Sequence, residues 1–146
     1  MDSQSWSEDR AREVISEQAG LEGPALPILH AIQAEFGFVP EGAVPLVADA
    51  LNLSRAEVHG IVTFYHDFRT EPARARVVKL CRAEACQARG VEALAAEAEA
   101  RHGTSVQIEA TFCLGLCACG PAALVDGVPY ARLTPERFDA ILERRP

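Results

Sequence analysis

The chain contains no apolar run near the roughly 18 residues that a membrane-spanning helix needs. Its N-terminal stretch is acidic and polar, and it lacks both the basic start and the apolar segment of a secretory signal. We therefore expect a cytoplasmic protein without membrane insertion. Stable disulfides are uncommon in that compartment, so clustered cysteines there usually serve metal binding or redox chemistry.

Basic residues are also scarce. The chain of 146 residues has 14 Lys and Arg against 21 Asp and Glu, which gives a net charge of −7. Surfaces that bind nucleic acids need clustered basic side chains to displace counterions from the phosphates. The charge balance therefore argues against a nucleic-acid partner, and it leaves a protein partner open.

Several signatures of enzymes are missing. The chain has no Gly-x-Gly-x-x-Gly and no phosphate-loop pattern, so we expect that it does not bind NAD or a flavin by itself. It has no nucleophile-elbow context for a hydrolytic triad. It also lacks the Cys-x-x-Cys pair of thioredoxin-type redox enzymes. We expect no catalytic residues on this chain.

Four segments in the first half carry apolar residues at helical spacing. The strongest local signal is the capping box Ser54-Arg-Ala-Glu57, which opens the fourth segment. We therefore predict a small helical bundle domain over residues 1–71. The residues expected on the inner faces of the four helices are Ala11, Val14, Ile15 and Ala19; Ile28, Leu29, Ile32 and Phe36; Val44, Val47, Ala48 and Leu51; and Val58, Ile61, Val62 and Tyr65.

The second half shows strand and helix patterns in the order β-α-β-β-β-α, after a polar stretch, 70–76, that we interpret as a linker. Asp126-Gly127 predicts the turn of a hairpin. Residues 72–146 are therefore expected to form a thioredoxin-like α/β domain, and the fold class is α+β. The predicted strands are 77–80, 106–110, 122–125 and 128–130, and the predicted helices are about 88–101 and a last one from Thr134 with Phe138, Ile141 and Leu142 inward.

Cysteines are the most informative feature that is present. Four of them form two offset pairs, Cys81-x4-Cys86 and Cys113-x3-Cys117. The first member of each pair follows a predicted strand, and in a small α/β sheet the two loops can lie side by side. Two pairs of thiolates suit a [2Fe–2S] cluster, in which each iron takes two. Such a protein transfers single electrons and performs no bond chemistry itself.

Other roles for these cysteines remain open from the spacing alone. A structural zinc site would use the same thiolates, although zinc sites favour Cys-x2-Cys spacing, which neither pair has. Buried, inert thiols are a further alternative. A fifth cysteine, Cys119, follows closely, so spacing does not decide between Cys117 and Cys119 as the fourth ligand.

The motifs resemble those of the thioredoxin-like [2Fe–2S] ferredoxin family, and the resemblance covers nearly the whole chain. The family's ligand pattern, Cys-x4-Cys followed by Cys-x3-Cys, matches Cys81, Cys86, Cys113 and Cys117. The family includes the small subunit beside the flavin subunit of respiratory NADH dehydrogenase and its relatives in soluble hydrogenases and formate dehydrogenases. Family-like sequences in the first half are residues 26–33, Phe36-Gly-Phe-Val-Pro40 and residues 53–68.

Within the family, residues 81–90 are most similar to the gamma subunit of NAD-dependent, molybdenum-containing formate dehydrogenase. The resemblance implies an electron-transfer subunit in a soluble complex, with FMN and NAD in a neighbouring diaphorase subunit and molybdenum in a catalytic subunit. Equivalent subunits of NADH:quinone oxidoreductase or of an NAD-linked hydrogenase are the alternatives. The commoner family pattern has no thiol at the position of Cys119.

The end of the fourth predicted helix is rich in aromatic residues and histidines. His59 and His66 lie seven residues apart near Phe64 and Tyr65. This segment packs against its own bundle or docks the flavin subunit; metal ligation is disfavoured because no cysteine or carboxylate cluster accompanies the histidines. Trp6 is either a staple on the bundle or an interface anchor.

Overall fold

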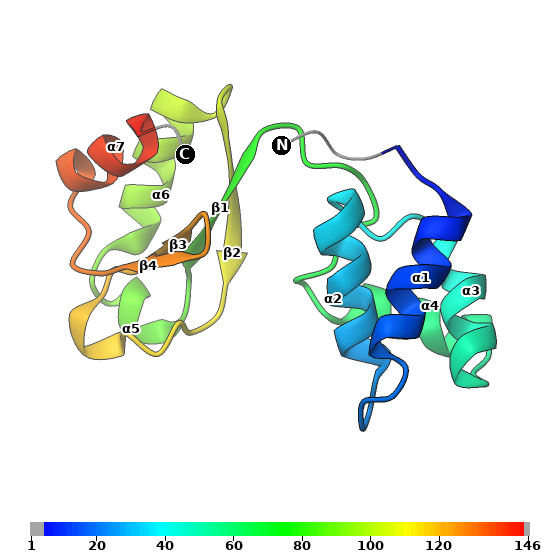
Figure 1. Ribbon diagram of the computed structural model, residues 1–146. Helices are drawn as coiled ribbons and strands as arrows, with labels where there is room; N and C mark the ends of the chain where they lie inside the picture. Colours follow the sequence, from blue (N-terminus) through cyan, green and yellow to red (C-terminus); the bar gives the residue numbers. More distant parts are fainter. Residues whose placement is uncertain (1–4, 145–146) are drawn as a thin grey trace. The chain divides into compact units, whose positions relative to one another are not determined.

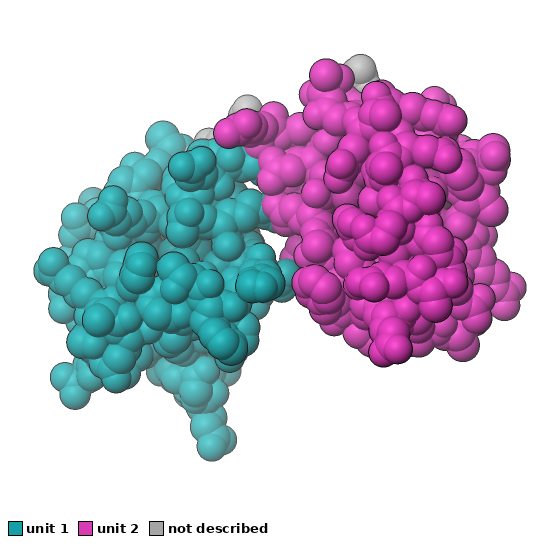
Figure 2. Space-filling view, turned by 180° about the vertical axis from the view of Figure 1, so that it is seen from behind, with its two compact units in different colours: residues 1–73 teal, residues 74–146 magenta. Residues whose placement is uncertain are grey.

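The computed structural model describes residues 5–144. The chain divides into two compact units, Met1–Ala73 and Arg74–Pro146, which are coloured separately in Figure 2. The sequence places the domain boundary after residue 71, two residues before this division.

Unit 1 consists of four helices: α1 (Glu8–Gln18), α2 (Ala25–Phe36), α3 (Ala43–Leu51) and α4 (Arg55–Phe64). Local signals explain their ends. The Ser7 side chain accepts a hydrogen bond from the Arg10 N–H at the start of α1, and Gly37 ends α2 in the left-handed conformation. The predicted capping box at the start of α4 is confirmed, since Ser54 and Glu57 bond reciprocally.

The core of unit 1 contains most of the residues expected there, including Phe36 and Val58. Two expectations are wrong. Tyr65 ends α4 with an extended backbone instead of continuing the helix, and its side chain is 43% exposed. Ala19 lies beyond the last turn of α1 and is exposed. Both residues follow the helical spacing in sequence, but each helix ends before its periodic pattern does.

Unit 2 is a four-stranded sheet in the order β2-β1-β3-β4, with helices α6 and α7 on the same side of it (Figure 1). β1 pairs with β2 in parallel and with β3 antiparallel. The α+β class and the thioredoxin-like unit are confirmed. The bounds are β1 (Arg76–Cys81), α5 (Glu84–Gln87), α6 (Val91–His102), β2 (Val106–Thr111), the short 3₁₀ helix η1 (Cys117–Cys119), β3 (Ala123–Val125), β4 (Val128–Tyr130) and α7 (Pro135–Glu143).

Alternate residues of the strands face the helices. Val78 and Leu80 of β1 are fully buried among side chains of α6 and α7, including Leu94 and Phe138. The β3–β4 hairpin is confirmed: Asp126 and Gly127 have φ values of 51° and 79°, the left-handed pair that a tight hairpin turn requires.

Three details of unit 2 differ from expectation. Arg76 belongs to β1 and not to the linker. The helix expected over about 88–101 begins only at Val91, after Gly90 at φ 83°, and a separate single-turn helix, α5, precedes it. The loop after Cys113 contains η1, which has no periodic signal in the sequence. Among the described residues, no helix is long and apolar enough to cross a membrane.

Candidate metal centre

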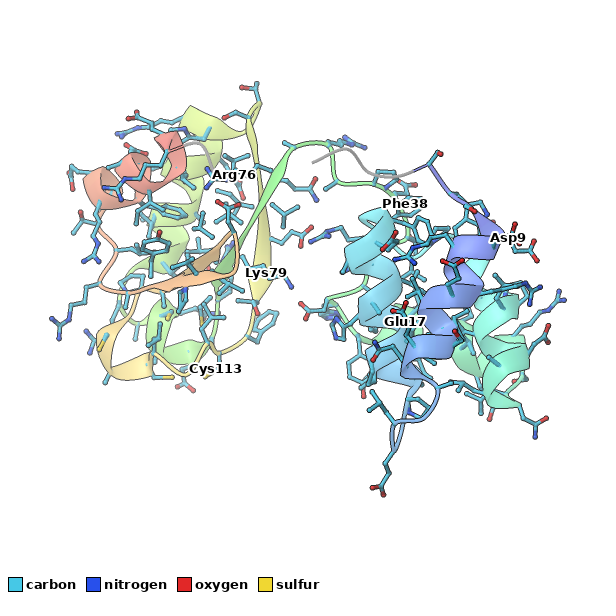
Figure 3. The ribbon with its side chains drawn as sticks, in the orientation of Figure 1. Asp9, Glu17, Phe38, Arg76, Lys79 and Cys113 are labelled. Atoms are coloured by element: carbon cyan, nitrogen blue, oxygen red, sulfur yellow. The ribbon has the colours of Figure 1, made fainter. Side chains whose placement is uncertain are left out.

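The parallel pairing of β1 and β2 brings the two cysteine loops together. Cys81, the last residue of β1, lies opposite Thr111, the last residue of β2, and Cys113 follows two residues later. Parallel strands end at the same edge of a sheet, so both loops start from one edge. Figure 3 shows Cys113 at the end of unit 2 remote from Arg76, which starts β1.

The first pair is buried. Cys81 and Cys86 are each 2% exposed, and a hydrogen bond joins their side chains. The helix α5 determines the position of Cys86. The Cys86 N–H donates to the carbonyl of Ala83 over 3.0 Å, and this turn brings the chain back toward Cys81 after four intervening residues. This single helical turn holds Cys86 at its x4 spacing from Cys81 more rigidly than an irregular loop would.

The second pair is exposed. The Sγ atoms of Cys113 and Cys117 lie 3.5 Å apart, and the Gly115 N–H donates to Cys113 Sγ over 3.4 Å. The loop is tight, with φ values of 76° at Cys113 and 75° at Gly115. Glycine suits position 115 because residues with an L side chain rarely adopt a positive φ.

Backbone N–H groups converge on the Cys81 sulfur. Burial is the largest single influence on the Cys81 pKa and raises it. Hydrogen bonds from the backbone of Ala83, Cys113 and Leu114 and from the Cys86 thiol outweigh burial, and the pKa of Cys81 lies below its ordinary value. Two of these donors belong to the other cysteine loop, so the loops cooperate in stabilising this thiolate.

Two other thiols, Cys86 and Cys117, resist ionisation beside it. Burial and the hydrogen bond with Cys81 raise the pKa of Cys86, and repulsion from the Cys81 and Cys117 thiolates adds to this. The hydrogen bond and charge of Cys113 raise the pKa of Cys117. Four thiolates this close repel one another, so a bound cation is needed to hold them all ionised.

Gly120 makes a close backbone approach to the first pair. A Cβ atom placed on it would lie 3.0 Å from Cys86 Sγ and 3.3 Å from Arg89 Cδ. Its φ of −62° is accessible to any residue, so close packing and not backbone conformation requires glycine here.

The site fits a two-iron cluster by its donor set. Within residues 5–144, no three Cys, His, Asp or Glu side chains are grouped closely enough to hold one ion. The thiols form two pairs, which is how a [2Fe–2S] cluster takes its four soft ligands. The N–H donors around Cys81 add the hydrogen bonds that commonly accompany thiolate ligation.

Cys119 lies apart from this network. Its carbonyl accepts a hydrogen bond from the Arg132 N–H over 2.6 Å, and its N–H donates to the Leu116 carbonyl over 2.9 Å. Among the described residues, its sulfur makes no hydrogen bond, whereas the sulfurs of Cys113 and Cys117 lie side by side. The spacing left open whether Cys117 or Cys119 is the fourth ligand, and the geometry favours Cys117.

Within the part of the chain that the structure describes, the histidines of unit 1 are not grouped with other candidate metal ligands. The His30 ring contacts the Phe68 ring in a tilted arrangement at 4.8 Å between centroids, and His59 lines a surface pocket of about 650 Å³ beside Arg55. Phe64 is 74% exposed and meets Tyr65 edge to face, so the chain's own bundle does not cover it.

Trp6 packs edge to face on Phe36 at 5.1 Å between ring centroids, and a Cβ on Gly42 would lie 3.1 Å from its ring. Trp6 therefore packs on its own bundle, as the staple interpretation expects, while 38% of the residue stays exposed.

Comparisons with known proteins agree with this geometry. The family model described as "Thioredoxin-like [2Fe-2S] ferredoxin" matches residues 11–145. One subunit of the NADH-quinone oxidoreductase of Escherichia coli (strain K12) is 30% identical over 129 residues, which cover 82% of this chain and 78% of that protein. NADP-reducing hydrogenase subunit HndA of Solidesulfovibrio fructosivorans is 27% identical over 130 residues, 83% of this chain and 76% of that protein.

Among solved structures, an NAD⁺-reducing [NiFe]-hydrogenase in the H₂-reduced state matches with a TM-score of 0.64 and 28% identity. The match covers 79% of this chain but only 21% of the hydrogenase chain. The chain therefore spans about a fifth of that larger protein.

Proposed function

The chain belongs to the thioredoxin-like [2Fe–2S] ferredoxin family, and from this membership we propose that it is an electron-transfer subunit of a larger NAD-linked oxidoreductase. The four thiolates of Cys81, Cys86, Cys113 and Cys117 would hold one [2Fe–2S] cluster. When bound, such a cluster takes up and releases one electron at a time. The chain supplies ligands, hydrogen bonds and burial, and it carries out no substrate chemistry.

The observation that carries this proposal is that both cysteine loops start from one edge of the sheet, because β1 and β2 pair in parallel with Cys81 opposite Thr111. In agreement with this placement, backbone hydrogen bonds from Cys113 and Leu114 of the second loop lower the pKa of the Cys81 thiol. Leu114 and Leu116 of the second loop are partly buried against the core of unit 2, which contains Cys81 and Cys86. Iron and acid-labile sulfide analysis tests the proposal: zinc without sulfide would replace it with a structural adaptor.

The flavin and NAD belong, in this proposal, to a partner diaphorase subunit. The chain has no phosphate-binding motif of its own. The similar proteins support such an assembly, because they are named as a subunit of NADH-quinone oxidoreductase and a subunit of an NADP-reducing hydrogenase.

Docking of that partner is assigned to the aromatic end of α4. Phe64 and Tyr65 are large and exposed, and aromatic side chains are the most frequent anchors of protein interfaces. Phe68 is buried beneath Tyr65 at 6.2 Å between ring centroids, which gives the exposed pair a firm base.

A formate dehydrogenase with a molybdenum catalytic subunit is our first candidate for the parent complex, on the likeness of residues 81–90 to its gamma subunit. NADH:quinone oxidoreductase and an NAD-linked hydrogenase are the second candidates, favoured by the names of the similar proteins. Purification from the native host with metal analysis separates them. Molybdenum with formate-dependent NAD reduction supports the first, and nickel or a quinone-reducing membrane fraction supports the others.

A further inference from the structure

Charged side chains around the cysteine site are few and unevenly distributed. The segment 111–125, which contains the second pair, has no Asp, Glu, Lys, Arg or His. The segment 82–90 has three charged residues, Arg82, Glu84 and Arg89. The charge of Arg82 is balanced, because its guanidinium pairs with both oxygens of Glu92 on α6.

Arg89 differs from Arg82 in two respects. Its Cδ and the Cys86 sulfur both lie within 3.3 Å of the point where a Cβ of Gly120 would be, so the arginine stem passes directly beside a proposed ligand. Among the described residues, its guanidinium has no carboxylate or other hydrogen-bonding partner. Arg89 thus carries an unbalanced positive charge on a side chain whose stem lies beside Cys86.

We propose that the charge of Arg89 raises the reduction potential of the centre held by the four cysteines. This inference rests on the proposed function. Reduction adds one electron to a group that is already anionic, so a nearby cation stabilises the reduced form more than the oxidised form. Arg89 acts here through its charge and does not bind the centre as a ligand.

The effect of Arg89 on the potential depends on its guanidinium having no carboxylate partner. A carboxylate beside the guanidinium would cancel most of its field, as Glu92 does for Arg82. Arg89 is exposed, so water and salt weaken its effect, and the shift in potential is expected to diminish at high ionic strength. A change in burial or in hydrogen bonding of the sulfurs would not respond to salt in this way.

The experiment is a redox titration of the isolated full chain carrying its cluster, followed by visible absorption and electron paramagnetic resonance. Dithionite supplies the single electron, which reduces one ferric iron to ferrous and breaks no bond. Arg89→Gln is expected to lower the midpoint potential, and Arg89→Glu to lower it by about twice as much, because the charge changes by two units instead of one. Arg89→Lys is expected to retain the parent potential.

The matched control is Arg74→Gln. Arg74 is exposed and precedes β1, whose last residue is Cys81. At about 3.3 Å per residue of extended chain, Arg74 lies on the order of 20 Å from Cys81. This variant is expected to leave the potential unchanged. Equal potentials for Arg89→Gln, Arg89→Glu and the parent would overturn the inference. A chain with no iron and no sulfide would instead overturn the proposed function, so the two failures are distinct.

Discussion

The two cysteine pairs differ in environment, and this difference sets what each residue can do. Cys81 and Cys86 are buried and receive backbone hydrogen bonds, whereas Cys113 and Cys117 are exposed. In the proposed function, the buried pair would therefore supply rigidity, and the exposed pair the shorter path to a redox partner.

Replacement of single cysteines tests the ligand assignment. Cys117→Ser removes a thiolate whose sulfur lies 3.5 Å from Cys113, and we expect the variant to lose the cluster or bind it weakly. Cys119→Ser is its matched control and is expected to keep the cluster. Iron content and visible absorption are the measurements. If Cys119→Ser came out colourless and Cys117→Ser did not, the assignment would be wrong.

Gly120→Ala tests the close approach beside Cys86. The added methyl would lie 3.0 Å from the sulfur, so the loop or the sulfur must shift, and we expect less cluster per chain after reconstitution. Gly60→Ala is the control: no atom lies within 4 Å of its Cβ position, and replacing a helical glycine should stabilise α4 by about 0.5–1 kcal/mol. Equal cluster content in both variants contradicts the packing argument.

Residue types carried most of the information about the site. The spacing of Cys81, Cys86, Cys113 and Cys117 is enough to mark them as candidate ligands. The sequence does not show the N–H donors to Cys81 or the approach of Gly120, because these depend on how two loops 26 residues apart meet.

One arginine adds side-chain contacts between the β3–β4 hairpin and the rest of unit 2, beside the pairing of β1 with β3. Arg76 on β1 pairs with Asp126 in the hairpin turn, and its guanidinium also donates to the carbonyls of Leu142 and Arg144 at the end of α7. The side chain thus joins the first strand, the hairpin and the last helix.

Asp126→Asn tests this connection by pH. The hydrogen bond from Arg76 holds the pKa of Asp126 below its ordinary value of about 3.9. The ion pair therefore stabilises the fold at pH values above that ordinary pKa, and the stabilisation is lost as the pH falls through the lower folded-state pKa. Asparagine retains the turn conformation, since it tolerates positive φ.

We expect Asp126→Asn to cost about 0.5–1 kcal/mol of unfolding free energy at neutral pH, a small value because the aspartate is 36% exposed. The difference from the parent should narrow below about pH 4. Urea unfolding at a series of pH values measures this difference in unfolding free energy. Asp49→Asn, at an exposed aspartate, is the control. A deficit that did not change with pH would show that the ion pair is not its cause.

Elements with strong local signals were predictable, including the short strands of the hairpin, whereas the one-turn helices α5 and η1 were not. The capping box at Ser54 and the Asp126-Gly127 turn fix their elements from a few neighbouring residues. In contrast, α5 is a single turn of four residues, too short to show a period, and the alanine-rich sequence around Gly90 hides the break before α6.

At the scale of the whole molecule, unit 1 carries the proposed docking surface and unit 2 carries the cysteines. Phe64→Ala and Tyr65→Ala are each expected to weaken binding to the flavin subunit by about 1 kcal/mol or more, because each removes an exposed aromatic anchor. Their visible spectra should equal that of the parent, since the thiols belong to the other unit.

Leu21→Ala is the control for this prediction, because Leu21 is also apolar and 50% exposed in unit 1. Affinity for the purified flavin subunit, measured by calorimetry, distinguishes the variants. Unchanged affinity for both aromatic variants would exclude this end of α4 from the interface.

The organisation into a helical part and a sheet part was visible in the sequence because the hydrophobic period changes near residue 75. The identity of the parent complex was not visible in the same way. It depends on exposed surfaces such as Phe64, whose proposed partner lies outside the chain.

Low-temperature electron paramagnetic resonance of the anaerobically reduced chain, with a spin count per chain, tests the central claim most directly. The account predicts a signal of about one unpaired electron per chain, with about two irons and two inorganic sulfides. A colourless chain, silent in resonance and containing no sulfide, would contradict it.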